Sequence, residues 1–163
     1  MKDILIKKLH EYIRENNPDV LLQLEEEGKV HEYLSEKLNT VGTLINQSGN
    51  GQPAYIIEET CMDVLTQELR PSRYNYILSI LEEEFEPAYQ QLQQSGTLRF
   101  EVINMISQCL PVFEDLNFSE ETVDNQFLRY AITGEIGEYL ETNVTSENEN
   151  VSNELQQSTK TEG

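Results

Sequence analysis

Hydrophobic residues recur at helical spacing along most of the chain. Spacings of three and four residues place the apolar side chains of each segment on one face, as in an amphipathic helix. Proline, glycine and polar clusters separate these segments, among them a glutamine-rich link over residues 90–96. The apolar stripes that predict helices are Leu5–Ile13, Val30–Ile45, Ala54–Leu69, Tyr74–Phe85, Leu98–Leu110 and Leu128–Tyr139. A shorter helix over residues 19–27 is expected to end at Gly28.

This pattern predicts an all-α fold. No run alternates with a period of two, and no β-branched run is bracketed by hairpin turns. We therefore expect a compact multihelical single domain of about six helices. Leu98–Leu110 is apolar around most of the helical wheel, which predicts the most buried helix, with Pro111 disturbing its end. Ser72 and Ser119 are expected to cap the helices that follow them.

The end of the chain has a different composition. From Asn143 to Gly163 the apolar side chains are Val144, Val151 and Leu155, and the remainder is mostly Asn, Ser, Thr, Glu and Gln. Such a segment buries too little surface to offset the entropy lost on ordering. We expect a helical domain over residues 1–142 and a disordered polar, acidic tail over residues 143–163.

The composition is strongly acidic. Thirty Asp and Glu residues stand against 11 Lys and Arg, which gives a formal net charge of −19. This charge disfavours direct binding to nucleic acid or to an anionic membrane, because both require basic residues. Two interpretations remain, which are solubility and a protein partner with a basic surface.

The acidic residues Glu82, Glu83 and Glu86 form the clearest local concentration of charge. We predict that they make an acidic interaction face. We expect Glu82 and Glu86 to lie one helical turn apart and to repel each other by a few tenths of a kcal/mol. Such a cost is consistent with a role in binding a cation or a basic protein, although a solvated helix face also explains it.

Cysteine usage and the absence of targeting signals favour a cytoplasmic location. The first eight residues contain two adjacent lysines and lack a signal-peptide core, and no run of 18 apolar residues occurs. Cys61 and Cys109 lie within apolar stripes. We therefore expect buried, reduced and unreactive thiols.

The two histidines do not form a metal motif. Neither His10 nor His31 has a second histidine four residues further on, and the neighbouring glutamates point elsewhere on a helix. The sequence also lacks a glycine-rich phosphate loop, a nucleophile elbow and a calcium loop. We assign no catalytic, cofactor-binding or metal-binding residues, expect no cofactor, and expect that the protein is not an enzyme.

The segment Ser72–Glu86 opens with Ser-Arg-Tyr and closes with Glu-Phe-Glu. Two further segments are Tyr12-Ile13 with Asn17-Pro18-Asp19, and Thr133–Ile136. These three segments, the first most distinctively, resemble a family of small uncharacterised helical proteins of Bacteroidetes, a domain of unknown function often carried on conjugative or integrated mobile elements. The resemblance implies a multihelical fold and no established activity. The stripe Val30–Ile45 departs from the family, whose second helix is rich in Arg and Ala.

These observations favour a non-enzymatic accessory or protein-interaction protein, and the resemblance adds a link to a mobile element. One alternative is an acidic protein that mimics DNA and sequesters a basic partner. A second is an enzyme whose site is assembled from dispersed residues between helices. A third is a homo-oligomer that uses an apolar stripe as its interface. No pattern in the chain names an activity.

Overall fold

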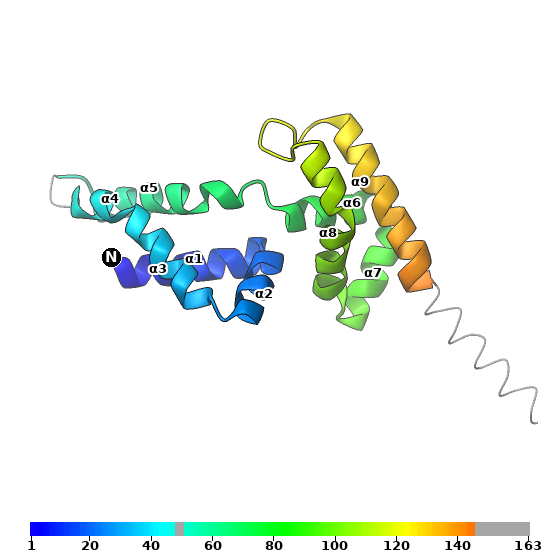
Figure 1. Cartoon of the computed structure of the whole chain (residues 1–163), viewed down its shortest axis with the longest axis horizontal. Coiled ribbons are helices and arrows are strands. Elements are labelled where there is room, and N and C mark those ends of the chain that lie inside the picture. The colour runs from blue at the N-terminus through cyan, green and yellow to red at the C-terminus, as the bar shows by residue number, and fades with distance from the viewer. Residues whose placement is uncertain (48–50, 146–163) are drawn as a thin grey trace, which may run out of the picture. The chain divides into compact units, whose positions relative to one another are not determined.

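The computed structural model of the chain describes residues 1–47 and 51–145 (Figure 1). Within these residues it has nine α-helices and no strand, which confirms the all-α class and shows that the expected number of six helices is wrong. A 3₁₀ turn (η2) and a π-helical segment (η3) complete the secondary structure. The elements are α1 (Lys2–Asn16), α2 (Pro18–Glu27), α3 (Val30–Thr40), α4 (Gly42–Asn46), α5 (Ala54–Thr66), η2 (Gln67–Leu69), α6 (Arg73–Glu84), α7 (Glu86–Ser95), α8 (Leu98–Asp115), α9 (Gln126–Tyr139) and η3 (Leu140–Thr145).

The additional helices arise where the backbone leaves the helical conformation within or beyond an apolar stripe. At Val41 (φ −108°, ψ 11°) the stripe Val30–Ile45 divides into α3 and α4. At Phe85 (φ −134°, ψ 47°) α6 ends and α7 begins. The segment expected to be a glutamine-rich link is therefore largely the helix α7. Val41 nevertheless remains fully buried, so the stripe predicts the core position even where the helix is interrupted.

The chain divides into two compact units, Met1–Tyr76 (unit 1) and Ile77–Gly163 (unit 2). A single helical domain over residues 1–142 was expected from the sequence. Hydrophobic periodicity reports which face of a helix is buried and carries no information about which helices share a core. The two units are therefore described separately.

Unit 1 is built around α1, which packs against α2, α3 and α5. The three longest helices that lie entirely within unit 1, α1, α3 and α5, each contribute one apolar stripe, as the spacing predicted. Cys61 lies within this core and is inaccessible to solvent. The core is formed by Leu5, Leu9, Ile13, Leu21, Leu34, Leu38, Val41, Ile57, Cys61, Leu65 and Leu69.

Unit 2 contains α6 from Ile77 onward, followed by α7, α8, α9 and η3, and its closest pairing is between α8 and α9. These two helices run antiparallel: Gln108 donates to Glu135 (3.3 Å), and Tyr139 donates to Glu101 near the other end (2.5 Å). The expectation that Leu98–Leu110 would be buried around most of its circumference is wrong, because Phe100 is 63% exposed and Leu110 is 39% exposed. The helix also continues through Pro111 to Asp115.

Of the three residues predicted to start or end a helix, Ser72 and Gly28 do so and Ser119 does not. Ser72 caps α6 as expected, since its Oγ accepts a hydrogen bond from the backbone N–H of Asn75 (3.0 Å). Gly28 ends α2 in the left-handed conformation (φ 68°). Ser119, in contrast, starts a turn rather than a helix, and Asn125 caps α9 through a bond from the N–H of Leu128 (3.1 Å).

The predicted tail falls mostly outside the part of the chain that the structure describes. Residues 143–145 belong to η3, so helical structure extends past the expected boundary at residue 142. Residues 146–163 lie outside the described residues. Among the helices that are described, none is both long enough and apolar enough to cross a membrane.

Candidate interaction surfaces

The predicted acidic face, Glu82, Glu83 and Glu86, is divided between two helices. Glu82 and Glu83 lie in the last turn of α6, whereas Glu86 is in the first turn of α7. Pro87 favours the break, because a proline inside a helix removes one backbone hydrogen bond and its ring clashes with the carbonyl of the residue four positions earlier. Glu82 and Glu86 therefore do not repel each other across one helical turn. Instead, Glu86 lies at the positive end of the α7 dipole and accepts a hydrogen bond from Gln90 (3.3 Å).

The second member of this face, Glu83, has a structural role within unit 2. Its carboxylate binds the guanidinium of Arg129 in α9 (2.5 Å), and Glu84 lies 3.7 Å from the same guanidinium. These contacts join α6 to α9. An exposed ion pair of this kind contributes at most about 1 kcal/mol to stability. Glu83 is thus partly neutralised, which leaves Glu82 and Glu86 as the more available carboxylates of the predicted face.

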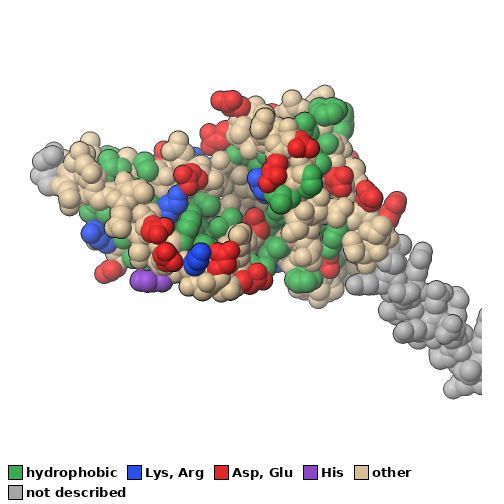
Figure 2. Space-filling model, viewed as in Figure 1, with side chains coloured by type: hydrophobic (Ala, Val, Ile, Leu, Met, Phe, Trp, Pro, Cys, Tyr) green, Lys and Arg blue, Asp and Glu red, His purple; other side chains and the backbone are tan. Residues whose placement is uncertain are grey.

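The acidity of the protein is unevenly distributed along the chain. Residues 77–145 contain 13 Asp and Glu against two basic residues, Arg99 and Arg129, a net charge of −11. Residues 1–76 contain the same number of acidic residues against eight Lys and Arg, a net charge of −5. The segment 146–163 has a net charge of only −3. The part of unit 2 that the structure describes therefore carries most of the charge, and acidic side chains outnumber basic ones over the surface shown in Figure 2.

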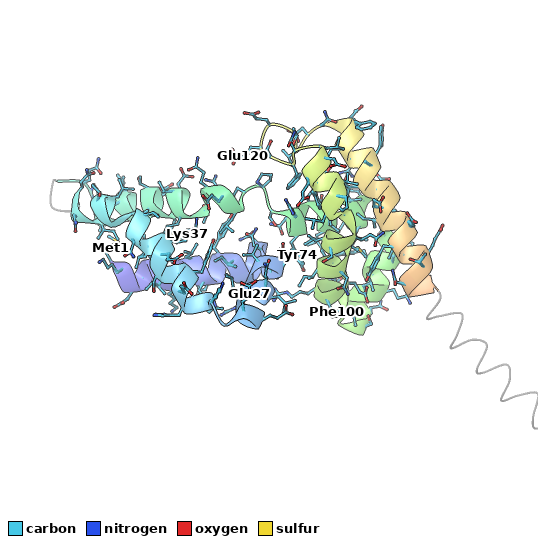
Figure 3. All side chains as sticks on the ribbon, viewed as in Figure 1. Met1, Glu27, Lys37, Tyr74, Phe100 and Glu120 are labelled. Carbon is cyan, nitrogen blue, oxygen red and sulfur yellow. The ribbon has the colours of Figure 1, made fainter. Side chains whose placement is uncertain are left out.

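Two exposed aromatic side chains of α9 were not among the site residues predicted from the sequence. Phe127 is 69% exposed and Tyr130 is 70% exposed. Both lie off the stripe Leu128–Tyr139, so their position on the helical wheel could have identified them. They follow a loop that carries three exposed carboxylates, Glu120, Glu121 and Asp124, the first of which is labelled in Figure 3. The structure thus places large aromatic rings next to concentrated negative charge.

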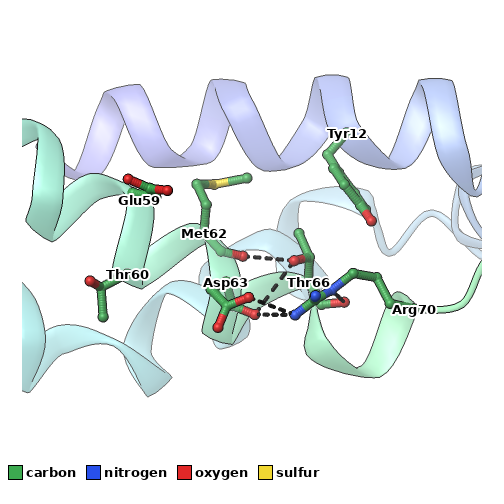
Figure 4. Close-up of a pocket in the computed structure, with 7 residues that line it drawn as sticks. All are labelled: Tyr12, Glu59, Thr60, Met62, Asp63, Thr66 and Arg70. Carbon is green, nitrogen blue, oxygen red and sulfur yellow. Dashed lines mark hydrogen bonds and ion pairs between the residues drawn. The ribbon is translucent and has the colours of Figure 1, made fainter. Parts of the chain in front are cut away.

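Unit 1 has an open groove of about 490 Å³ between α1 and the end of α5 (Figure 4). Arg70 closes one side, where its guanidinium binds Asp63 (2.8 Å) and donates to the backbone carbonyl of Asp63 (3.1 Å). Tyr12 points into the groove from α1, and burial raises the pKa of its hydroxyl while Arg70 lowers it. Because Arg70 is paired with Asp63, and the other charged residue of the lining is Glu59, the groove has little free positive charge with which to recognise a ligand.

Polar contacts join the end of α1 to the turn before α6. Asn17, only 5% exposed, donates to the backbone carbonyl of Leu69 (3.1 Å). Ser72 donates to the backbone carbonyl of Asn16, whose side chain in turn accepts from Asn75 (3.0 Å). No local signal could have revealed these contacts, since the partners are more than 50 residues apart in sequence. They bring together two of the segments that carry the family resemblance.

A cleft of about 270 Å³ adjoins this junction and includes Asp19 and Arg73. Burial raises the pKa of the Asp19 carboxyl, while the backbone N–H groups of Asp19 and Val20 and the charge of Arg73 lower it. Asp19 Oδ1 and Asn17 Oδ1 are buried, and neither has a hydrogen-bond partner among the described residues. Unpaired buried acceptors destabilise a fold, so these two oxygen atoms offset part of the stability that the hydrogen bonds of the junction provide.

The thiols are buried, as expected. Burial raises the pKa of Cys61, and burial together with the negative charge of Glu135 raises the pKa of Cys109 to about 12. Neither His10 nor His31 lines the groove or the cleft of unit 1. In the described ranges, no group of three or more His, Cys, Asp or Glu side chains is arranged to hold a metal ion.

Comparison with known proteins places the chain in a family without assigning it an activity. The family described as "Domain of unknown function (DUF1896)" matches residues 5–145. No curated protein and no solved structure matches the chain. The matched segment extends over most of both units and ends at the last residue of η3. This chain therefore belongs to the DUF1896 family, a domain of unknown function.

Proposed function

We propose that the protein is a non-enzymatic accessory protein that binds a partner with a basic surface, and that unit 2 is the part that binds. The observation that carries this proposal is the charge asymmetry between the units: −11 over residues 77–145 against −5 over residues 1–76. Solubility alone would require no such concentration. A surface of one sign raises the rate of encounter with a partner of the opposite sign.

The electrostatics of α9 support the same conclusion. Arg129, one of the two basic residues among 77–145, is held between Glu83 and Glu84. The positive charge of Arg129 is therefore neutralised within unit 2, and most carboxylates of residues 77–145 have no basic residue of that segment to pair with. A partner that supplies guanidinium or ammonium groups would relieve this repulsion between like charges.

The setting we propose follows the family resemblance. It links such proteins to mobile elements in Bacteroidetes, and the DNA-handling proteins of such elements need basic surfaces to bind phosphates. We therefore favour a basic DNA-binding protein as the partner, with the acidic surface of unit 2 competing for the residues that contact DNA. Glu82 and Glu86 are part of this surface, in the cytoplasm of the host.

A defined basic probe tests this proposal. The affinity of the full chain for a fluorescent decaarginine peptide is measured by anisotropy at low and at physiological salt. We expect binding that weakens as salt rises, because surface charges are screened. Replacing Glu82 and Glu86 by glutamine should weaken binding more than the same change at Glu25 and Glu26, two exposed residues of unit 1.

The two double variants distinguish binding at a particular surface from attraction by the net charge of the whole chain. Glu83 is left unchanged because it holds Arg129. Both double variants alter the net charge equally, so net charge alone would weaken binding equally. An equal loss would contradict the assignment to unit 2, and the absence of salt-sensitive binding would contradict the proposed function.

A further inference from the structure

The solvent-facing side of α9 carries an unusual combination of residues. Phe127, Tyr130, Gly134 and Glu138 are separated by three, four and four residues, so they lie on one face of the helix. All four are exposed. We call these four residues the α9 face. It presents two aromatic rings, then a position without a side chain, then a carboxylate.

Gly134 serves no packing purpose within the described structure. A Cβ atom built at this position would meet nothing within 4 Å, and the residue has no positive φ. Glycine inside a helix is nevertheless less stable than alanine. A bare backbone at this point lets another chain approach the helix closely.

Carboxylates precede and follow the aromatic pair along the chain. Asp124 is exposed three residues before Phe127, and Glu138 lies two turns after Tyr130 on the same face. Arginine suits such a surface, since its guanidinium stacks on aromatic rings and binds carboxylates in a planar, two-pronged geometry. Lysine offers a point charge and stacks less well.

We propose that the α9 face docks an arginine-bearing segment of a protein partner, with guanidinium groups over Phe127 and Tyr130 and the partner backbone passing closest at Gly134. This inference rests on the proposed function and names the site and the chemistry of the partner. A second copy of this chain fits poorly, because each copy would bring a further −11 of charge from residues 77–145. Exposed aromatic side chains are typical anchors of protein interfaces.

The experiment compares decaarginine with decalysine on the full chain. We expect tighter binding of decaarginine and an approximately tenfold loss of its affinity when Phe127 and Tyr130 are both replaced by alanine. Tyr55→Ala is the matched control, because Tyr55 is 68% exposed and belongs to unit 1. It should leave the affinity unchanged. Gly134→Leu should also weaken binding, whereas a methyl group in Gly134→Ala should change it little.

Each outcome separates this inference from the proposed function. If decaarginine and decalysine bind equally and the aromatic variant binds like the original chain, the α9 face is wrong, while the glutamine variants of Glu82 and Glu86 still test the basic partner. If neither peptide binds, both proposals fail. A dimer, seen by light scattering, that dissociates on the double substitution of Phe127 and Tyr130 would assign the face to a second copy and overturn the inference.

Discussion

Replacing Ser72 by alanine removes a hydroxyl that joins the end of α1 to the first turn of α6. Ser72 Oγ accepts from the N–H of Asn75 at the start of α6 and donates to the carbonyl of Asn16 at the end of α1. The side chain is buried, so water cannot easily replace either contact. Loss of an N-cap costs about 1 kcal/mol, and loss of a second hydrogen bond costs a similar amount. We expect a destabilisation of about 2 kcal/mol.

The assay is thermal and urea unfolding followed by circular dichroism. A destabilisation of this size lowers the Tm by roughly 8–16 °C if a unit of 60–100 residues unfolds alone, and by roughly 4–8 °C if a domain of 150 residues unfolds as a whole. The size of the shift therefore also reports whether the two units unfold together. The denaturant slope should not change, since the folded surface is the same.

A serine elsewhere in unit 1 provides the control. Ser35 lies inside α3, away from its ends, and its replacement by alanine should be neutral or slightly stabilising because alanine has the higher helix propensity. If Ser72→Ala lowers the free energy of unfolding by less than about 0.5 kcal/mol, the capping contact is weaker than we infer. Equal effects of the two substitutions would refute the reasoning.

Three further outcomes follow from the structure. Gly134→Ala should raise the free energy of unfolding by about 0.5–1 kcal/mol in urea titrations, while Gly28→Ala should lower it because Gly28 has φ 68°. Asp19→Asn should raise the Tm at pH 7, because the folded-state pKa of Asp19 is raised and its charged form therefore destabilises the fold above that pKa. The difference in Tm between the variant and the original chain should vanish as the pH falls below about 4, which Tm measurements across pH would show. Cys61 and Cys109 should react with a thiol reagent at pH 8 only after denaturation, and rapid reaction of the folded chain would contradict their burial.

Features set by local chemistry could be predicted from the sequence. The apolar stripes identified the core of unit 1, including Val41 and Cys61, because helical spacing decides which side chains can face inward. Ser72 and Gly28 were recognised because a cap requires a particular side chain or a left-handed backbone at one position. Apolar spacing and capping residues both determine structure within a few residues of their own position.

Features set by long-range packing could not be predicted. The contacts of Asn16 and Asn17 with the turn before α6 depend on partners more than 50 residues away. The break at Phe85 was missed because the apolar stripe continues to that residue, although Pro87 was a usable sign. Ser119 was mistaken for a helix cap because a serine followed by glutamates also suits a turn, and Asn125 lies only six residues further on.

The candidate surface was found only in part from the sequence. Glu82, Glu83 and Glu86 were selected for their local density, but Glu83 pairs with Arg129 from a distant helix. Counting charges over segments rather than over runs would have shown the concentration in residues 77–145. The exposure of Phe127 and Tyr130 also follows from their position off the apolar stripe of α9.

The central claim is that unit 2 docks a basic partner, and the site of binding tests it most directly. Amide chemical shifts of the isotope-labelled full chain are followed while decaarginine is added at physiological salt. The account predicts shifts concentrated in residues 120–138, on the acidic loop and the α9 face, with smaller changes near Glu82 and Glu86. Shifts confined to residues 1–76, or spread evenly over all acidic segments, would contradict it.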